Sequence, residues 1–121
     1  MDITPLLRPE QKTIQSYSDG AFRISGEIYR HPVLVTDEVV THWTSSEAPL
    51  MPSEEIRLLQ GKIDILLIGA GRTHTILPPS QRVIWQGLGF TVDIMDTMAA
   101  CRTYNILTAE GRRVAAALIP V

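Results

Sequence analysis

The chain has 121 residues, of which 45% are hydrophobic and 20% are charged, and its formal net charge at pH 7 is −2. This composition is typical of one globular domain, and it excludes disordered, collagen-like and coiled-coil proteins. The single cysteine, Cys101, excludes a disulfide scaffold. Residues 1–60 carry a charge of −4 and residues 61–121 a charge of +2, and neither half has the dense basic stripe that nucleic-acid binding requires.

The N-terminus and the hydrophobic pattern both bear on location. The first nine residues have no positively charged start and no long apolar run, which is unlike a signal or transit peptide. The apolar stretches, such as residues 65–68 and 114–119, are far shorter than the roughly 20 residues that span a bilayer. We therefore expect a soluble, cytoplasmic protein with one domain over residues 1–121, in which residues 1–11 form a loosely ordered segment.

The first part of the chain consists of short β-like runs separated by turns. Ser18-Asp19-Gly20 and Ser25-Gly26 are turn signals. His31-Pro32 interrupts the series, because proline cannot donate a hydrogen bond in a ladder. The pattern predicts a small antiparallel meander with strands at residues 12–17, 21–25, 27–31, 33–36 and 39–43.

A short helix is expected next. Ser53 is the predicted N-cap, and Glu54 and Glu55 place negative charge in the first turn, where it suits the helix dipole. Gly61 is the predicted end of this helix.

The rest of the chain alternates strand and helix. The predicted elements are a buried strand at 63–68, a helix at 80–88, a strand at 90–95, a helix at 98–110 capped by Asp96 or Thr97, and a strand at 114–119. Strands that alternate with helices become parallel neighbours joined by right-handed crossovers. The sequence therefore predicts an α/β fold with a βαβαβ second half and a small antiparallel sheet in front of it.

The first candidate site is Gly69-Ala70-Gly71, at the end of the buried strand. Ligands of open α/β sheets bind beyond the carboxyl ends of the strands. A dinucleotide fingerprint would need glycine where His74 stands, and no Gly-Lys-Ser/Thr follows to make a P-loop. A tight glycine turn without a ligand remains the simpler interpretation.

The polar loop Arg72-Thr73-His74-Thr75 is the second candidate. It carries a guanidinium, an imidazole and two hydroxyls, and the N-terminus of the following helix could lie beside it. Such a group can hold a small anion such as phosphate or carboxylate. The alternative is a solvated loop.

The helix at 98–110 has two distinct sides. Ala100, Cys101, Tyr104 and Leu107 recur at helical spacing and predict a face that packs on the sheet. Cys101 is therefore expected to be an inert buried thiol. On the other side, Arg102 and Asn105 share a surface with Met98 and could contact a partner.

The sequence gives little support for a metal site or for a catalytic nucleophile and base. His31, His42 and His74 are scattered along the sequence, and one cysteine cannot build a thiolate cluster. No residue is marked as a nucleophile with its base, and Asp96 is expected to be a helix cap rather than a general base. We expect no metal, no cofactor and no catalytic residue, and a core position for Trp85.

Several segments together resemble a known family. They are Ile-Gly-Ala-Gly at 68–71, Gly-Phe-Thr-Val-Asp-Ile-Met-Asp-Thr at 89–97, Ala-Cys-Arg-Thr-Tyr-Asn-Ile-Leu at 100–107 and Glu-Gly-Arg-Arg-Val-Ala-Ala-Ala-Leu-Ile at 110–119. Phe-Arg-Ile-Ser-Gly at 22–26 and Trp43 also fit. Over residues 12–120 the chain resembles the family of mitochondrial complex I assembly factor 3 and its small prokaryotic relatives, a domain of unknown function. Members often have Gly-Thr-Gly where this chain has Gly69-Ala70-Gly71.

The resemblance implies a three-layer α/β fold with a central mixed, mostly parallel sheet. It also implies a role in assembling the peripheral arm of NADH:ubiquinone oxidoreductase, with another assembly factor as partner. The family has no agreed catalytic residues, so none is carried over. The absence of a mitochondrial presequence is expected for a bacterial member.

Two functions follow as hypotheses. The first is a non-enzymatic binding or assembly factor that holds a protein partner, with a homodimer as a further option at an unpaired edge of the meander. The second is a small-molecule or anion binder, or an enzyme, at the glycine turn. The candidate ligand- or partner-binding residues are Gly69, Gly71, Arg72, His74, Asp96, Thr97, Arg102 and Asn105.

Overall fold

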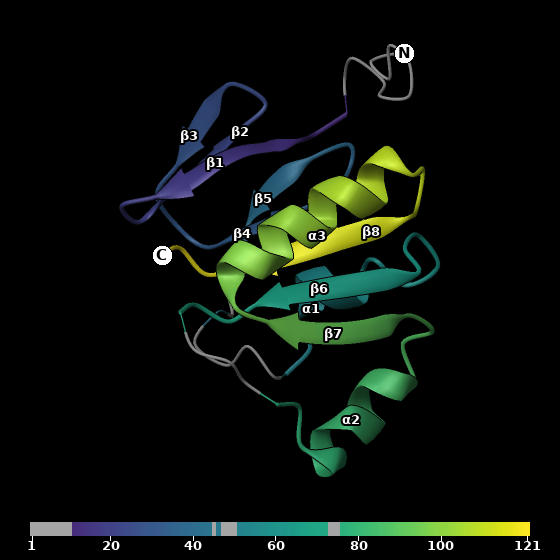
Figure 1. Cartoon of the computed structure of the whole chain (residues 1–121). Helices are drawn as coiled ribbons and strands as arrows, with labels where there is room; N and C mark the ends of the chain where they lie inside the picture. The colour runs from purple at the N-terminus through teal and green to yellow at the C-terminus, as the bar shows by residue number, and fades with distance from the viewer. Residues whose placement is uncertain (1–10, 45, 47–50, 73–75) are drawn as a thin grey trace.

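The computed structural model describes residues 11–44, 46, 51–72 and 76–121. In these residues eight strands form two sheets, and three helices lie against the larger sheet (Figure 1). The elements are β1 (Ile14–Ser18), β2 (Ala21–Ile24), β3 (Glu27–Tyr29), β4 (Val33–Val35), β5 (Val40–His42), α1 (Glu54–Arg57), β6 (Ile65–Gly69), α2 (Pro79–Gln86), β7 (Thr91–Met95), α3 (Thr97–Ala109) and β8 (Val114–Leu118).

The central sheet has the strand order β5-β4-β8-β6-β7. β6 pairs in parallel with both β7 and β8, while β4 pairs antiparallel with both β8 and β5. Four strands therefore run in one direction and β4 runs in the other. The predicted α/β class, with a mixed, mostly parallel sheet and a βαβαβ second half, is confirmed.

The front meander consists of β1, β2 and β3. Its two hairpin turns are Asp19-Gly20 and Ser25-Gly26, and all four residues have positive φ. Such turns match the twist of the flanking strands, which is why the two turn signals were informative.

The strands expected at 33–36 and 39–43 do not extend the meander, contrary to the sequence pattern. They form the β4–β5 hairpin at one edge of the central sheet, where β4 pairs with β8. Val33, Leu34 and Val35 are all buried. A strand that is apolar on both faces needs cover on both sides, and the central sheet provides it.

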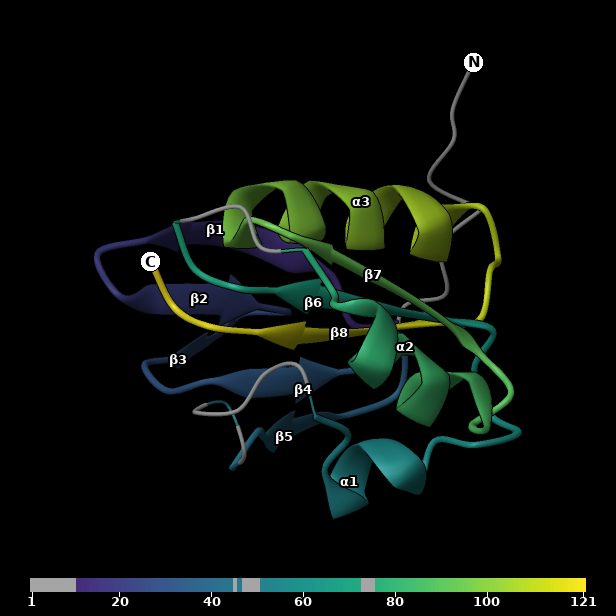
Figure 2. The same ribbon diagram turned by 90° about the horizontal axis from the view of Figure 1, so that it is seen from below.

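The domain has three layers (Figure 2). One face of the central sheet is covered by α3 and the meander, whose shared core includes Phe22, Ile24 and Tyr104. The other face is covered by α1 and α2, with Trp43 and Trp85 in its core. Trp85 is 2% exposed, which confirms its predicted core position.

The helix ends follow from local chemistry. The Ser53 hydroxyl accepts a hydrogen bond from the Ile56 amide at 3.4 Å, and Asp96 Oδ1 accepts one from the Ala99 amide at 2.9 Å. Asp96, rather than Thr97, is thus the N-cap of α3. Gly111, at φ +80°, follows the last turn of α3 and ends it.

At Gly69, the end of β6 lies very close to the start of α3. An added Cβ would lie 2.9 Å from Leu118 Cδ2 and 3.0 Å from Thr97 Cα. Only a residue without a side chain lets the start of α3 lie this close to the end of β6.

We predict that Gly69→Ala destabilises the fold by about 1–3 kcal/mol, because the new methyl group must displace backbone at Thr97. Urea denaturation measures this as a lower midpoint. Gly87→Ala is the matched control: Gly87 has φ −71°, and an added Cβ would lie 4.0 Å from the Ile84 carbonyl oxygen. We expect that control to change stability by less than roughly 0.5 kcal/mol. Equal midpoints for the two variants would contradict the close approach.

Candidate functional site

The predicted glycine turn is joined to two other segments by hydrogen bonds. Thr97 Oγ1 donates to the Ile119 carbonyl oxygen at 2.7 Å and accepts from the Gly71 amide at 2.9 Å. The Thr97 amide donates to the Gly71 carbonyl oxygen at 2.8 Å, and the Ile119 amide to that of Gly69 at 3.0 Å. Thr97 is fully buried. The ends of β6 and β8 and the start of α3 are therefore fastened together at this edge.

The structure gathers four of the predicted site residues at this edge. Gly69, Gly71, Asp96 and Thr97 lie at the carboxyl ends of β6 and β7 and at the start of α3. Arg72 follows them with an exposed side chain, and His74 lies outside the described residues. The polar groups of Asp96 and Thr97 make contacts within the chain. A ligand role for this group stays a prediction.

Arg102 and Asn105 lie further along α3 and contact β1. Asn105 Oδ1 accepts from the Ile14 amide at 3.0 Å, and Asn105 Nδ2 donates to the Ile14 carbonyl oxygen at 2.7 Å. Arg102 Nη1 donates to the Tyr17 hydroxyl at 3.1 Å. The side of α3 that was expected to be available for a partner thus holds the meander of the same chain.

The inner side of α3 carries two groups that burial keeps neutral. Burial raises the pKa of the Cys101 thiol to about 12, and nearby Arg102 opposes the rise. Burial also raises the pKa of Tyr104 to about 12, which the Thr108 hydroxyl opposes and Asp37 reinforces. The Tyr104 hydroxyl donates to the Lys12 carbonyl oxygen at 3.0 Å. Because a thiol is nucleophilic only as the thiolate, Cys101 has the predicted character of an inert core residue.

Two of the histidines are not scattered in space. The rings of His31 and His42 have centroids 4.3 Å apart, and Tyr29 meets His31 edge-on at 6.0 Å. Their approach follows from β4 pairing with β5, which places Val33 opposite His42. Among the described residues, no cluster of three or more histidine, cysteine or acidic side chains is arranged to bind a metal ion.

A cavity of about 830 Å³ lies at the opposite edge of the central sheet, where β6 and β8 begin. It is bounded by the β4–β5 turn, the C-terminal end of α3 and the segments that lead into β6 and β8. No sequence pattern predicts this cavity, because residues from four separate segments line it and none of these segments forms a motif.

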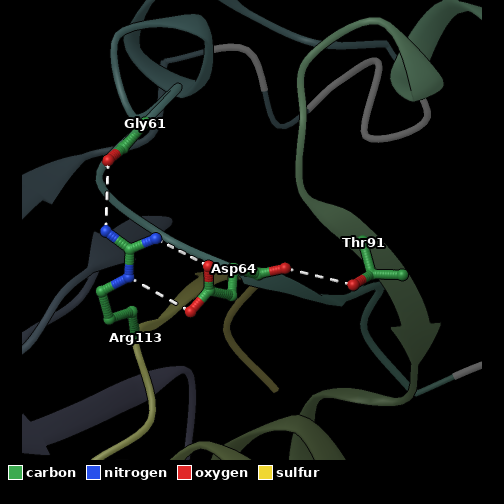
Figure 3. A network of polar contacts seen from close by, with 4 residues as sticks. All are labelled: Gly61, Asp64, Thr91 and Arg113. Carbon is green, nitrogen blue, oxygen red and sulfur yellow. Dashed lines mark hydrogen bonds and ion pairs between the residues drawn. The ribbon is translucent and has the colours of Figure 1, made fainter.

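A polar network fixes the strand starts beside the cavity (Figure 3). Arg113 Nη2 and Nε donate to the two carboxylate oxygens of Asp64 at 2.7 and 3.1 Å, and Arg113 Nη1 donates to the Gly61 carbonyl oxygen at 3.2 Å. Thr91 Oγ1 donates to the Asp64 carbonyl oxygen at 3.1 Å. The hydrogen bonds and charge of Arg113 lower the pKa of Asp64. The network links the beginnings of β6, β7 and β8, and the charge of Arg113 is compensated.

The fold and these contacts define a three-layer α/β domain. Residues 14–119 match the family described as protein of unknown function (DUF498/DUF598), and the chain belongs to this family.

Named relatives and a solved structure agree with this assignment. An uncharacterised protein of Rhodobacter capsulatus is 38% identical over 89% of this chain and 84% of its own length. NADH dehydrogenase [ubiquinone] 1 alpha subcomplex assembly factor 3 of mouse is 32% identical over 93% of this chain and 62% of its own length. A crystal structure from Bordetella parapertussis is 36% identical, with a TM-score of 0.81 over 92% of this chain and 97% of the other.

The family expected from the sequence is thereby confirmed, and the chain spans about three fifths of the mouse relative. None of the described helices has the length and apolar character that crossing a bilayer would need.

We predict that Asn105→Ala destabilises the fold by about 1–3 kcal/mol, since it removes both partners of the Ile14 backbone. Amide hydrogen exchange at Ile14 should also become faster. Arg102→Ala, which removes only an exposed contact to Tyr17, serves as the control, with an expected change within roughly 0.5 kcal/mol. Unchanged exchange at Ile14 would contradict the docking role of Asn105.

We further predict that Cys101 resists alkylation in the native state. At pH 8, iodoacetamide should react at least about 100-fold more slowly than in urea, because the thiol pKa of about 12 leaves almost no thiolate. Folding raises the pKa of this thiol above its ordinary value of 9. The resulting contribution to the free energy of unfolding is fully present below pH 9 and is lost as the pH rises toward 12. Mass spectrometry of the labelled protein measures the rate, and native labelling as fast as in urea would show that Cys101 is accessible.

Proposed function

We propose that this chain binds a protein partner as a non-enzymatic factor in the assembly of a respiratory NADH dehydrogenase. The observation that carries the proposal is its likeness to animal NADH dehydrogenase assembly factor 3, which extends over about nine tenths of this chain. The buried core residues of the domain lie within residues 14–119, the range of the family match. A surface built on the same fold can therefore bind the same kind of partner.

The exposed apolar side of α2 is the surface that we assign to this partner. Val83 and Ile84 of α2 are 67% and 39% exposed, and Ile76, which precedes the helix, is 75% exposed, although Trp85 of α2 is buried. α2 lies next to β7, which is the outer strand of the central sheet. Adjacent exposed apolar side chains are typical of protein-binding surfaces. Arg102 and Asn105 stay candidates for a partner contact, although their side chains also contact β1.

A second copy of the chain is the alternative occupant. The edge strands of the two sheets, which are β1 and β3 in the meander and β5 and β7 in the central sheet, have no further strand beside them in the described residues. Asp93 on β7 is exposed and would face a like charge if two β7 strands paired antiparallel around it. This repulsion favours a different protein at α2. The cytoplasmic location expected from the sequence stays a prediction.

The test is a cross-linked pull-down of the tagged chain from its natural host, with wild type and two variants. Val83→Asp places a charge in the α2 surface, while Ile106→Asp places one at a similarly exposed position on α3. We expect wild type and Ile106→Asp to recover NADH dehydrogenase subunits, and Val83→Asp to recover at least about tenfold less, since burying an unpaired charge weakens binding.

The outcomes separate the parts of the proposal. Equal recovery by both variants would show that α2 is not the contact surface. Recovery of the chain alone, or only of a second copy of it, would contradict the assembly role. Circular dichroism of both variants checks that the fold is retained.

A further inference from the structure

The cavity at the amino ends of β6 and β8 has the size and lining of a small-molecule site. Its volume of about 830 Å³ falls within the range of ligand pockets in proteins. Part of its lining is apolar, from Val39, Leu59, Ile63 and Val114. This site lies at the opposite edge of the sheet from the glycine turn, and it is independent of the α2 surface.

One side of the cavity is basic. Lys62 precedes β6, and Arg112 precedes β8, which is the neighbouring strand. Both side chains are exposed. Arg113 also lines the cavity, but its charge is compensated by Asp64. Lys62 and Arg112 therefore supply the positive charge that a ligand would meet on this side.

The other side is acidic and holds a buried acceptor. Asp37 and Glu38 lie in the β4–β5 turn, and β4 flanks β8 on the side away from β6. Gln11 Nε2 donates to the Thr108 carbonyl oxygen at 3.2 Å, while Gln11 Oε1 is buried and has no donor within the described residues. Because this oxygen has almost no accessible surface, a ligand in the cavity would meet the Glu38 carboxylate instead.

We propose that this cavity binds a zwitterion with an apolar body, namely an apolar amino acid or a short peptide with free ends. The ligand ammonium group would lie toward Glu38, and its carboxylate toward Lys62 and Arg112. The Glu38 carboxylate in the lining disfavours a simple anion. The charged groups on both sides likewise disfavour a neutral apolar ligand, because binding would remove water from them without replacing its hydrogen bonds.

The probe is the dipeptide Leu-Leu, compared with its N-acetylated, C-amidated and doubly blocked forms. Each is titrated into the ¹⁵N-labelled full chain while amide shifts are followed by NMR. We expect the free dipeptide to shift the amides of Val39, Lys62 and Gly111, and each blocked form to bind at least about tenfold more weakly. Lys62→Gln combined with Arg112→Gln should weaken binding to a similar extent. Arg82→Gln, on α2 and outside the cavity, is the control and should bind like the wild type.

Each other outcome overturns the proposal. If the N-acetylated form binds as tightly as the free dipeptide, the site recognises anions. If the doubly blocked form does so, the site recognises only apolar groups. Shifts confined to residues outside the cavity, or none at all, would show that the cavity does not bind this class of ligand. The ¹⁵N spectra of the variants report directly whether the fold is intact.

Discussion

The contact of Thr97 with Gly69 and Gly71 determines how the layers of this domain fit together. A single buried hydroxyl accepts from the Gly71 amide and donates to the Ile119 carbonyl oxygen, and the absence of a side chain at Gly69 lets the two backbones approach. Buried polar groups must find partners, and here one side chain satisfies groups from two neighbouring strands at once. The axis of α3 over β8 and β6 follows from this anchoring point together with the cap at Asp96.

The second anchoring point of α3 holds the front sheet. The three-stranded meander buries its apolar face in a core that it shares with α3 and the central sheet. Phe22 and Ile24 supply the apolar contact, but such contacts tolerate sliding. The two hydrogen bonds from Asn105 to the Ile14 backbone fix the position of β1 along α3. One helix thus connects the central sheet to the meander, with the Thr97 end fastened to the former and Asn105 to the latter.

Local chemistry explains which features could be predicted from the sequence. The turns at Asp19-Gly20 and Ser25-Gly26, the cap at Asp96 and the alternation of strands and helices after residue 60 all depend on neighbours within a few positions. The placement of β4 beside β8 depends on a partner some 80 positions away, and the pairing of Asn105 with Ile14 on one 91 positions away. No short pattern encodes such distances, so a polar helix side that holds a strand looks the same in the sequence as one that binds another protein.

The two ends of the strands in the central sheet differ in how their polar groups are used. Open α/β sheets usually bind ligands at the carboxyl ends of their strands, and the glycines after β6 point to that edge. Here Thr97 and the last residues of the chain use much of the polar capacity of that edge internally. At the amino ends, by contrast, Arg113 and Asp64 pair with each other, while Lys62, Arg112 and Glu38 leave exposed charged side chains around the cavity. An edge whose hydrogen bonds are internally satisfied is suited to stability, and an edge with charges on both sides of a cavity is suited to recognition, and this difference is the physical basis for proposing a ligand at the amino ends of the strands.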